Sequence, residues 1–180
     1  DEDEIIDEAK KRADEVLKRS EDILRRAREE VEKVLEEVRK IIEDVHRRSR
    51  KVLEDVRRKA KREDVEKAIE DVEREDKRLV EELKKVLEEI RRTIERLAEE
   101  LKRVNDESRD RIRKLEELVK RGLDVETVVR RVDEIVKRNE ELARRLVEEA
   151  KKIVDDLRRL AEEIVKRSED LVEKLKEDAR

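Results

Sequence analysis

The chain has no cysteine, proline, methionine or aromatic residue, and it has only one glycine. Without cysteine it can form neither a disulfide framework nor a thiolate metal site. A single glycine cannot supply the glycine-rich loops of phosphate-binding and dinucleotide-binding folds. No apolar run exceeds two residues, whereas a transmembrane helix needs about 20 predominantly apolar residues. These absences exclude disulfide-stapled proteins, P-loop and dinucleotide-binding folds, and membrane-spanning helices.

Charged residues dominate what remains. They make up 60% of the chain, with 52 basic and 56 acidic side chains and a net charge of −4. Such compositions are often disordered, but here the net charge is small and the apolar residues, 34% of the chain, keep a strict helical phase. Acidic and basic residues alternate, as in ion pairs between residues four apart on exposed helix faces. We therefore expect a folded helical protein without the basic surface of a nucleic-acid binder.

Aliphatic residues recur every 18 positions, as at Ile5, Ile23 and Ile41. Eighteen residues make five turns of a straight α-helix, whereas a heptad repeat gives a left-handed supercoil and an 11-residue repeat a right-handed one. The repeat therefore predicts long, essentially untwisted helices. The other series at this interval are Val16, Val34 and Val52; Leu17, Leu35 and Leu53; Leu79, Leu97 and Leu115; Val129, Val147 and Val165; and Val136, Val154 and Val172.

Two interruptions divide the repeat. The apolar phase slips between Ala60 and Val65, where Asp64 suits the N-cap of a new helix. Gly122 suits the left-handed position after a helix end, and Asp124 suits the cap of the helix that follows. The sequence thus predicts a single three-helix bundle over residues 1–180. Its helices span about 5–60, 65–120 and 125–178, with loops at about 61–64 and 121–124.

The predicted fold class is all-α, an antiparallel up-down-up three-helix bundle of long, essentially untwisted helices. Short connections between helices place consecutive helices antiparallel. The apolar stripe has about seven positions in every 18, which is wider than a two-stranded seam and suits a helix that faces two partners.

Several polar residues interrupt the apolar stripe. In an antiparallel helix pair, residues at one height have numbers with a constant sum. The polar residues of the first two helices pair with a sum of 125, and those of the last two with a sum of 244; half of each sum falls in a predicted loop. One predicted layer contains Ser20, Asn105 and Asn139, with Ser108 one turn away. The other contains Ser49, Asp76 and Ser168, with His46 on the edge of the same face.

The polar layers have a structural interpretation. A buried polar group is costly unless it is hydrogen-bonded, so such layers disfavour every helix register that leaves their members unpaired. Ser49, His46 and Asp76 are also the residue types of a catalytic triad. Regular helices offer no strained serine and no oxyanion hole, however, and two candidate ligands do not make a metal site. We therefore expect a hydrogen-bonding role, with no catalytic, metal or cofactor-binding residue.

The chain resembles computationally designed helical bundles with straight parametric backbones and built-in buried hydrogen-bond networks. The resemblance covers the whole chain. It rests on the 18-residue aliphatic repeat, the charged surface, the two polar layers and the repeated Asp-Val-Glu at 64–66 and 124–126. The chain departs from such designs in its first loop, which has neither glycine nor proline. The resemblance implies a structural scaffold without a natural function or a natural cellular location.

Three functional classes follow from these observations. The leading expectation is a soluble, monomeric scaffold that is not an enzyme and needs no cofactor, ligand or partner, with self-association left open. The alternative is a self-associating or heteromeric interaction module whose stripes pair between chains. A lipid-surface amphipathic protein is the third class. The lack of aromatic residues and the polar layers at the centre of the stripe argue against lipid binding.

Overall fold

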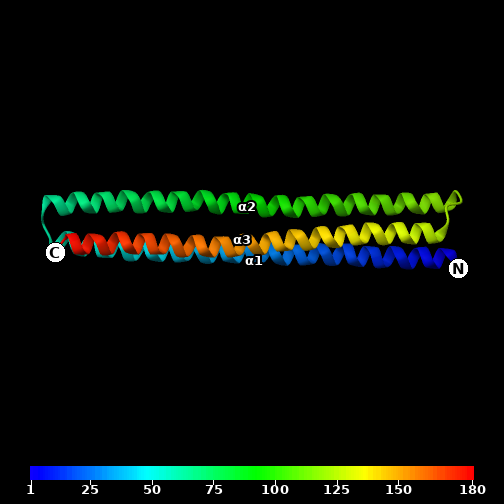
Figure 1. The fold of residues 1–180 in the computed structure, drawn as a ribbon, viewed down its shortest axis with the longest axis horizontal. Coiled ribbons are helices and arrows are strands. Elements are labelled where there is room, and N and C mark those ends of the chain that lie inside the picture. The colour runs from blue at the N-terminus through cyan, green and yellow to red at the C-terminus, as the bar shows by residue number, and fades with distance from the viewer. The chain divides into compact units, whose positions relative to one another are not determined.

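A computed structural model describes residues 1–180 and contains three α-helices and no strands. They are α1 (Glu2–Lys59), α2 (Glu63–Lys120) and α3 (Val125–Asp178), shown in Figure 1. The predicted all-α, three-helix fold is confirmed. The helix bounds agree with those expected from the sequence to within three residues. No helix is apolar enough over a sufficient length to cross a membrane.

The first loop is shorter than the apolar phase suggested. It spans residues 60–62, and the amide of Glu66 donates to the carbonyl of Arg62 at 3.0 Å as the first bond of α2. Arg62 is therefore the N-cap residue, and the prediction of Asp64 as the cap is wrong. Asp64 lies in the first turn instead, where its charge still complements the helix dipole. Arg57 ties α1 to α2 beside this loop through Glu66, at 3.1 Å.

The second loop follows the sequence prediction closely. Gly122 has φ of +102°, the left-handed conformation that glycine adopts without strain. Its amide donates to the carbonyl of Val119 at 3.0 Å, and the amide of Leu123 donates to that of Leu118 at 2.9 Å. This pair of bonds is a Schellman motif. Asp124 then caps α3, because its carbonyl accepts the amide of Val128 at 3.2 Å.

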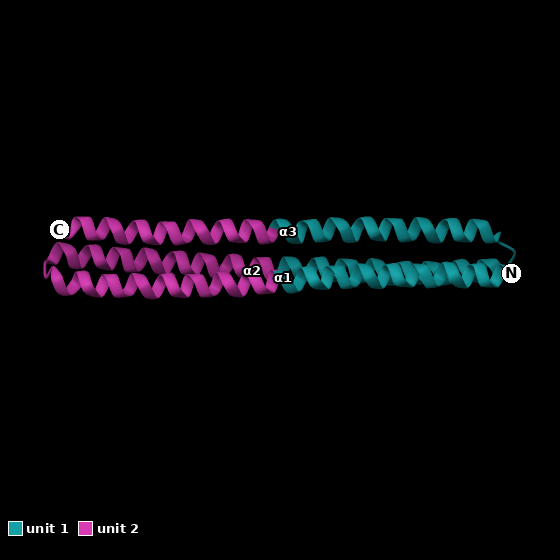
Figure 2. Cartoon of the chain, turned by 90° about the horizontal axis from the view of Figure 1, so that it is seen from below, with its two compact units in different colours: residues 1–30, 92–152 teal, residues 31–91, 153–180 magenta.

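The chain divides into two compact units, coloured separately in Figure 2. Unit 1 comprises Asp1–Glu30 and Arg92–Lys152, and unit 2 comprises Val31–Arg91 and Ile153–Arg180. Each unit therefore contains a part of all three helices. The organisation of residues 1–180 as a single domain, and the lack of supercoil, remain predictions.

Both units have an aliphatic core to which all three helices contribute. In unit 1, Ala13 of α1, Ile112 of α2 and Val132 of α3 belong to one buried cluster. The buried cluster of unit 2 likewise contains residues from each helix, among them Leu53 of α1, Ile69 of α2 and Leu175 of α3. Full burial of one such side chain contributes roughly 1.5–3 kcal/mol before the cost of chain ordering. The cores thus come from the residues that the helical phase placed on the inner face.

Candidate functional site: two buried polar layers

Seven polar side chains are buried among the aliphatic residues of the two units. All were expected there from their place in the apolar stripe, and each is at most 6% exposed. His46, expected on the edge of the stripe, has a side chain that is 32% exposed. The seven buried residues are Ser20, Asn105, Ser108 and Asn139 in unit 1, and Ser49, Asp76 and Ser168 in unit 2.

The polar layer of unit 1, called the asparagine layer below, is built around an amide pair. The Nδ2 of Asn139 donates to the Oδ1 of Asn105 at 2.8 Å, which joins α3 to α2. The hydroxyl of Ser108 lies 3.0 Å from the Oδ1 of Asn139 and 2.8 Å from the carbonyl of Val104, so its one proton is shared between two acceptors. Three of the four residues expected in this layer are therefore hydrogen-bonded together.

Ser20 does not join the asparagine layer, and its expected bond with Asn105 is not formed. Its hydroxyl donates to the carbonyl of Val16 at 3.0 Å, one turn back in its own helix. The Nδ2 of Asn105 instead reaches α1 through the carbonyl of Leu17 at 3.3 Å and the Oε1 of Glu21 at 3.1 Å. Glu21 is a residue that the sequence interpretation missed, because it lies on the edge of the stripe.

Glu21 also connects the asparagine layer to the surface. Arg109 donates to the same Oε1 at 3.1 Å and lies 3.6 Å from the Oδ1 of Asp14. The pKa of Asp14 is lowered, mainly by the hydrogen bond from Lys18 and further by the positive charges of Lys18 and Arg109, although partial burial opposes the shift. The buried amides are thus connected through Glu21 to a network of ionised groups on the surface of unit 1.

The polar layer of unit 2, called the aspartate layer below, is a chain of hydrogen bonds that converges on one carboxylate. The Oγ atoms of Ser49 and Ser168 are 3.1 Å apart. Ser168 donates to the Oδ1 of Asp76 at 3.0 Å, and the Nδ1 of His46 lies 2.6 Å from the Oδ2. All four expected residues are brought together, and they connect the three helices.

The chemistry of the groups fixes the direction of this chain. When Asp76 is ionised, its carboxylate can only accept hydrogen bonds, so the Nδ1 of His46 then carries a proton and donates it to the Oδ2 of Asp76. The hydroxyl of Ser168 donates its one proton to Asp76, so in the serine pair the hydroxyl of Ser49 donates to that of Ser168. Both carboxylate oxygens are thereby paired, as a buried charge requires.

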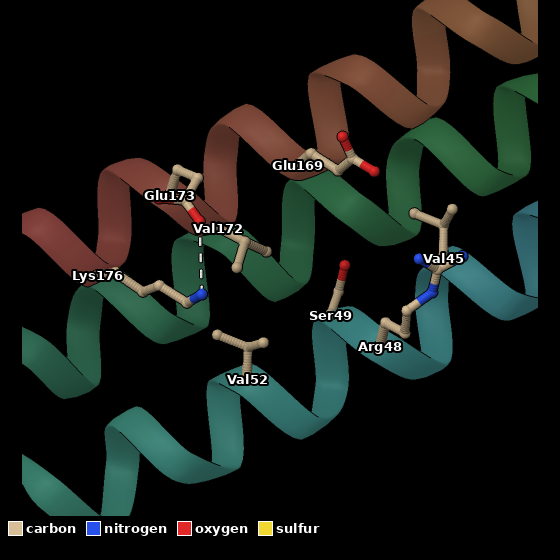
Figure 3. A pocket seen from close by; sticks show the side chains of 8 residues that line it. All are labelled: Val45, Arg48, Ser49, Val52, Glu169, Val172, Glu173 and Lys176. Carbon is tan, nitrogen blue, oxygen red and sulfur yellow. Dashed lines mark hydrogen bonds and ion pairs between the residues drawn. The ribbon is translucent and has the colours of Figure 1, made fainter.

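The order of groups in the aspartate layer differs from that of a catalytic triad. In a triad, the imidazole stands between the serine and the acid and takes the serine proton. Here Asp76 stands between Ser168 and His46, so the imidazole is not placed to accept a proton from Ser49. Ser49 lies at a hollow of about 250 Å³ between α1 and α3, shown in Figure 3. The surrounding backbone is helical and offers no free amides for an oxyanion.

No group of three or more histidine, cysteine or acidic side chains is arranged to hold a metal ion.

The comparisons with known proteins do not assign the chain to a family. No protein-family model matches the chain, and no curated protein and no solved structure shows significant similarity to it.

Proposed function

We propose that the protein is a designed structural scaffold in which the two polar layers select the helix register, with no reaction, no required ligand and no natural biochemical role. The observation that supports this most is the pairing of buried amides and hydroxyls across helices. The Asn139–Asn105 and Ser168–Asp76 bonds, at 2.8 and 3.0 Å, both link α3 to α2. A buried polar group that lost its partner in another register would cost about 1–3 kcal/mol.

The composition and the helix ends support a designed origin. The core uses no aromatic or sulfur-containing side chain, and an 18-residue aliphatic repeat continues along the helices. The second loop combines a Schellman motif with an aspartate cap, the combination recommended for idealised helices. Idealised backbones of this kind are typically hyperstable.

Thermal unfolding and solution mass test the scaffold proposal. We expect light scattering to give the mass of one chain, 21.8 kDa, and the helical circular dichroism signal to persist well beyond about 60 °C, near the upper end of the range for mesophilic domains. A cooperative transition below that temperature would contradict an idealised scaffold. A turnover of activated esters that disappears in Ser49→Ala would contradict the absence of a reaction.

One observation favours the alternative of a self-associating module. Ile5, Ile23 and Ile41 follow the interval of the aliphatic repeat along α1 and are 46%, 45% and 46% exposed. A regular row of exposed isoleucines is a surface that a second chain could cover. A concentration-dependent mass that falls to that of one chain in the triple variant with glutamate at these positions would establish this alternative.

A further inference from the structure

A shallow groove runs between α2 and α3 in unit 1, close to the second loop. Its floor is aliphatic, with Leu115, Leu118 and Ile135 among the lining residues, and its volume is about 340 Å³. Leu118 is 38% exposed and is the only large apolar side chain of α2 or α3 that is this open to solvent. This α2–α3 groove therefore presents an uncovered apolar surface of ligand-binding size.

The rim of the α2–α3 groove is strongly basic. Arg111, Lys114, Arg131 and Arg138 line it, against the single acid Glu134. Lys114 is paired with Asp110 at 3.2 Å, but the three arginines make no ion pair. Several arginines of α1 and α2 pair with a carboxylate three or four positions away along the helix, but such pairs are not general on this surface. Three guanidinium groups are thus available beside an apolar floor.

A second groove in the same protein shows that this charge is not a general feature. The groove between α1 and α3 in unit 2 is larger, about 530 Å³, and Val38, Ile41 and Val165 are part of its apolar lining. Its rim has three acidic and two basic side chains, so its net charge is negative. The two grooves offer similar apolar surfaces under rims of opposite charge.

We propose that the α2–α3 groove binds a free single-chain amphiphilic anion, such as an alkyl sulfate or an alkyl carboxylate. The alkyl chain lies on Leu118 and Ile135 and removes their apolar surface from water. The anionic head group pairs with Arg111 and Arg138, because guanidinium groups bind sulfate and carboxylate through two parallel hydrogen bonds. Leu115 and Ile135 also belong to the aliphatic core of unit 1, but Leu118, Arg111 and Arg138 take no part in that core or in the polar layers. The site is therefore distinct from the proposed scaffold role.

Methyl NMR of the full chain with decyl sulfate, kept below its micelle concentration, tests the site. We expect saturable shifts of the Leu118 and Ile135 methyl signals, with the Ile41 signals of the control groove unchanged. Shifts of Ile41 equal to those of Leu118, or the absence of a saturable shift at Leu118, would overturn the proposal. Decyl trimethylammonium carries the same chain with a cationic head, and we expect it to leave Leu118 unshifted; equal binding of this cation would show that the rim does not select charge.

Matched variants assign the head-group contacts. Arg111→Gln and Arg138→Gln should each weaken decyl sulfate binding about two- to fivefold, the range of exposed ion pairs, and the double variant should weaken it further. Arg158→Gln in the control groove removes the same charge and should leave the affinity unchanged. Circular dichroism verifies that each variant folds. Equal affinities for all these variants would overturn the assignment.

A lipid bilayer could supply the same chemistry, so vesicles separate the two sources. Vesicles that contain phosphatidylglycerol should not co-sediment the protein, since a groove that holds one alkyl chain does not require a membrane surface. Binding to these vesicles without binding to free decyl sulfate would contradict the proposal. Raising the salt concentration should weaken the binding of free decyl sulfate, because the rim charges are exposed and screened.

Discussion

The amide pair of the asparagine layer provides a quantitative test of its role. Asn105→Leu removes the acceptor of the Asn139 Nδ2, and Asn139→Leu removes the donor to the Asn105 Oδ1. Both residues are at most 2% exposed, so a group that loses its partner here is largely removed from water. In the double variant neither amide remains, and Ser108 keeps the carbonyl of Val104 as its acceptor.

The expected magnitude follows from the number of stranded groups. Each single variant leaves one buried polar group without its partner, which costs about 1–3 kcal/mol. The gain from burying each leucine occurs equally in the single and double variants and cancels in a double-mutant cycle. The double variant should therefore be more stable than the sum of the single effects by about 2–3 kcal/mol, near the upper end of measured interaction energies. Its total stability should be close to that of the parent chain, since paired polar groups can be replaced by apolar ones at little cost.

Guanidinium chloride unfolding of the four chains measures this interaction energy. If the parent chain does not unfold in guanidinium chloride at room temperature, all four chains are unfolded at the same higher temperature. An interaction energy below about 0.5 kcal/mol, the usual error of additivity, would refute the reasoning. The amide pair would then contribute nothing beyond its two separate side chains.

Three further predictions follow from single side chains. Ser20→Ala should change the free energy of unfolding by less than about 0.5 kcal/mol, because its hydroxyl bonds only within α1; a denaturant-measured loss above about 1 kcal/mol would place Ser20 in the asparagine layer. Gly122→Ala should lower the free energy of unfolding by about 1–2 kcal/mol in the same assay, because φ at this position is +102°. An added Cβ meets nothing within 4 Å, so the backbone conformation alone causes the loss; an unchanged stability would contradict the left-handed turn. The lowered pKa of Asp14 means that its small contribution to stability is present above the unfolded pKa and is lost as the pH falls through the folded one. Carbon-13 titration of the Asp14 carboxyl should show its pKa rise in Lys18→Gln, and an unchanged pKa would contradict the attribution to Lys18.

The helices and the second loop could be predicted from the sequence because each depends on local rules. The helical phase of the aliphatic residues marks the inner face, and Gly122 is the only glycine, the residue that adopts a left-handed turn at the lowest cost. The first loop was harder to place. Glu63 and Asp64 are both acidic residues suited to a first helical turn, so nothing local decides which one begins α2.

The polar layers could be predicted only to the level of height along the helices. Constant sums of residue numbers bring Asn105, Asn139 and Ser20 to one height, but the reach of a side chain decides which atoms meet. Ser20 has a short side chain with an acceptor in its own helix. Glu21 is long enough to reach Asn105 from the edge of the stripe. The stripe identifies which residues are buried but not which flexible neighbours extend toward them.

The spacing of the polar residues along the helices also restricts the register of α3 against α2. The interval from Asp76 to Asn105 on α2 equals the interval from Asn139 to Ser168 on α3, and it is not a multiple of the aliphatic repeat. A slip of α3 against α2 by one aliphatic repeat would keep the aliphatic faces in phase and leave every polar position without its counterpart. A slip by the polar interval, about eight helical turns, could match one polar position at most. The aliphatic repeat alone would allow several registers of α3 against α2. The polar interval differs from that repeat, so only one register satisfies both.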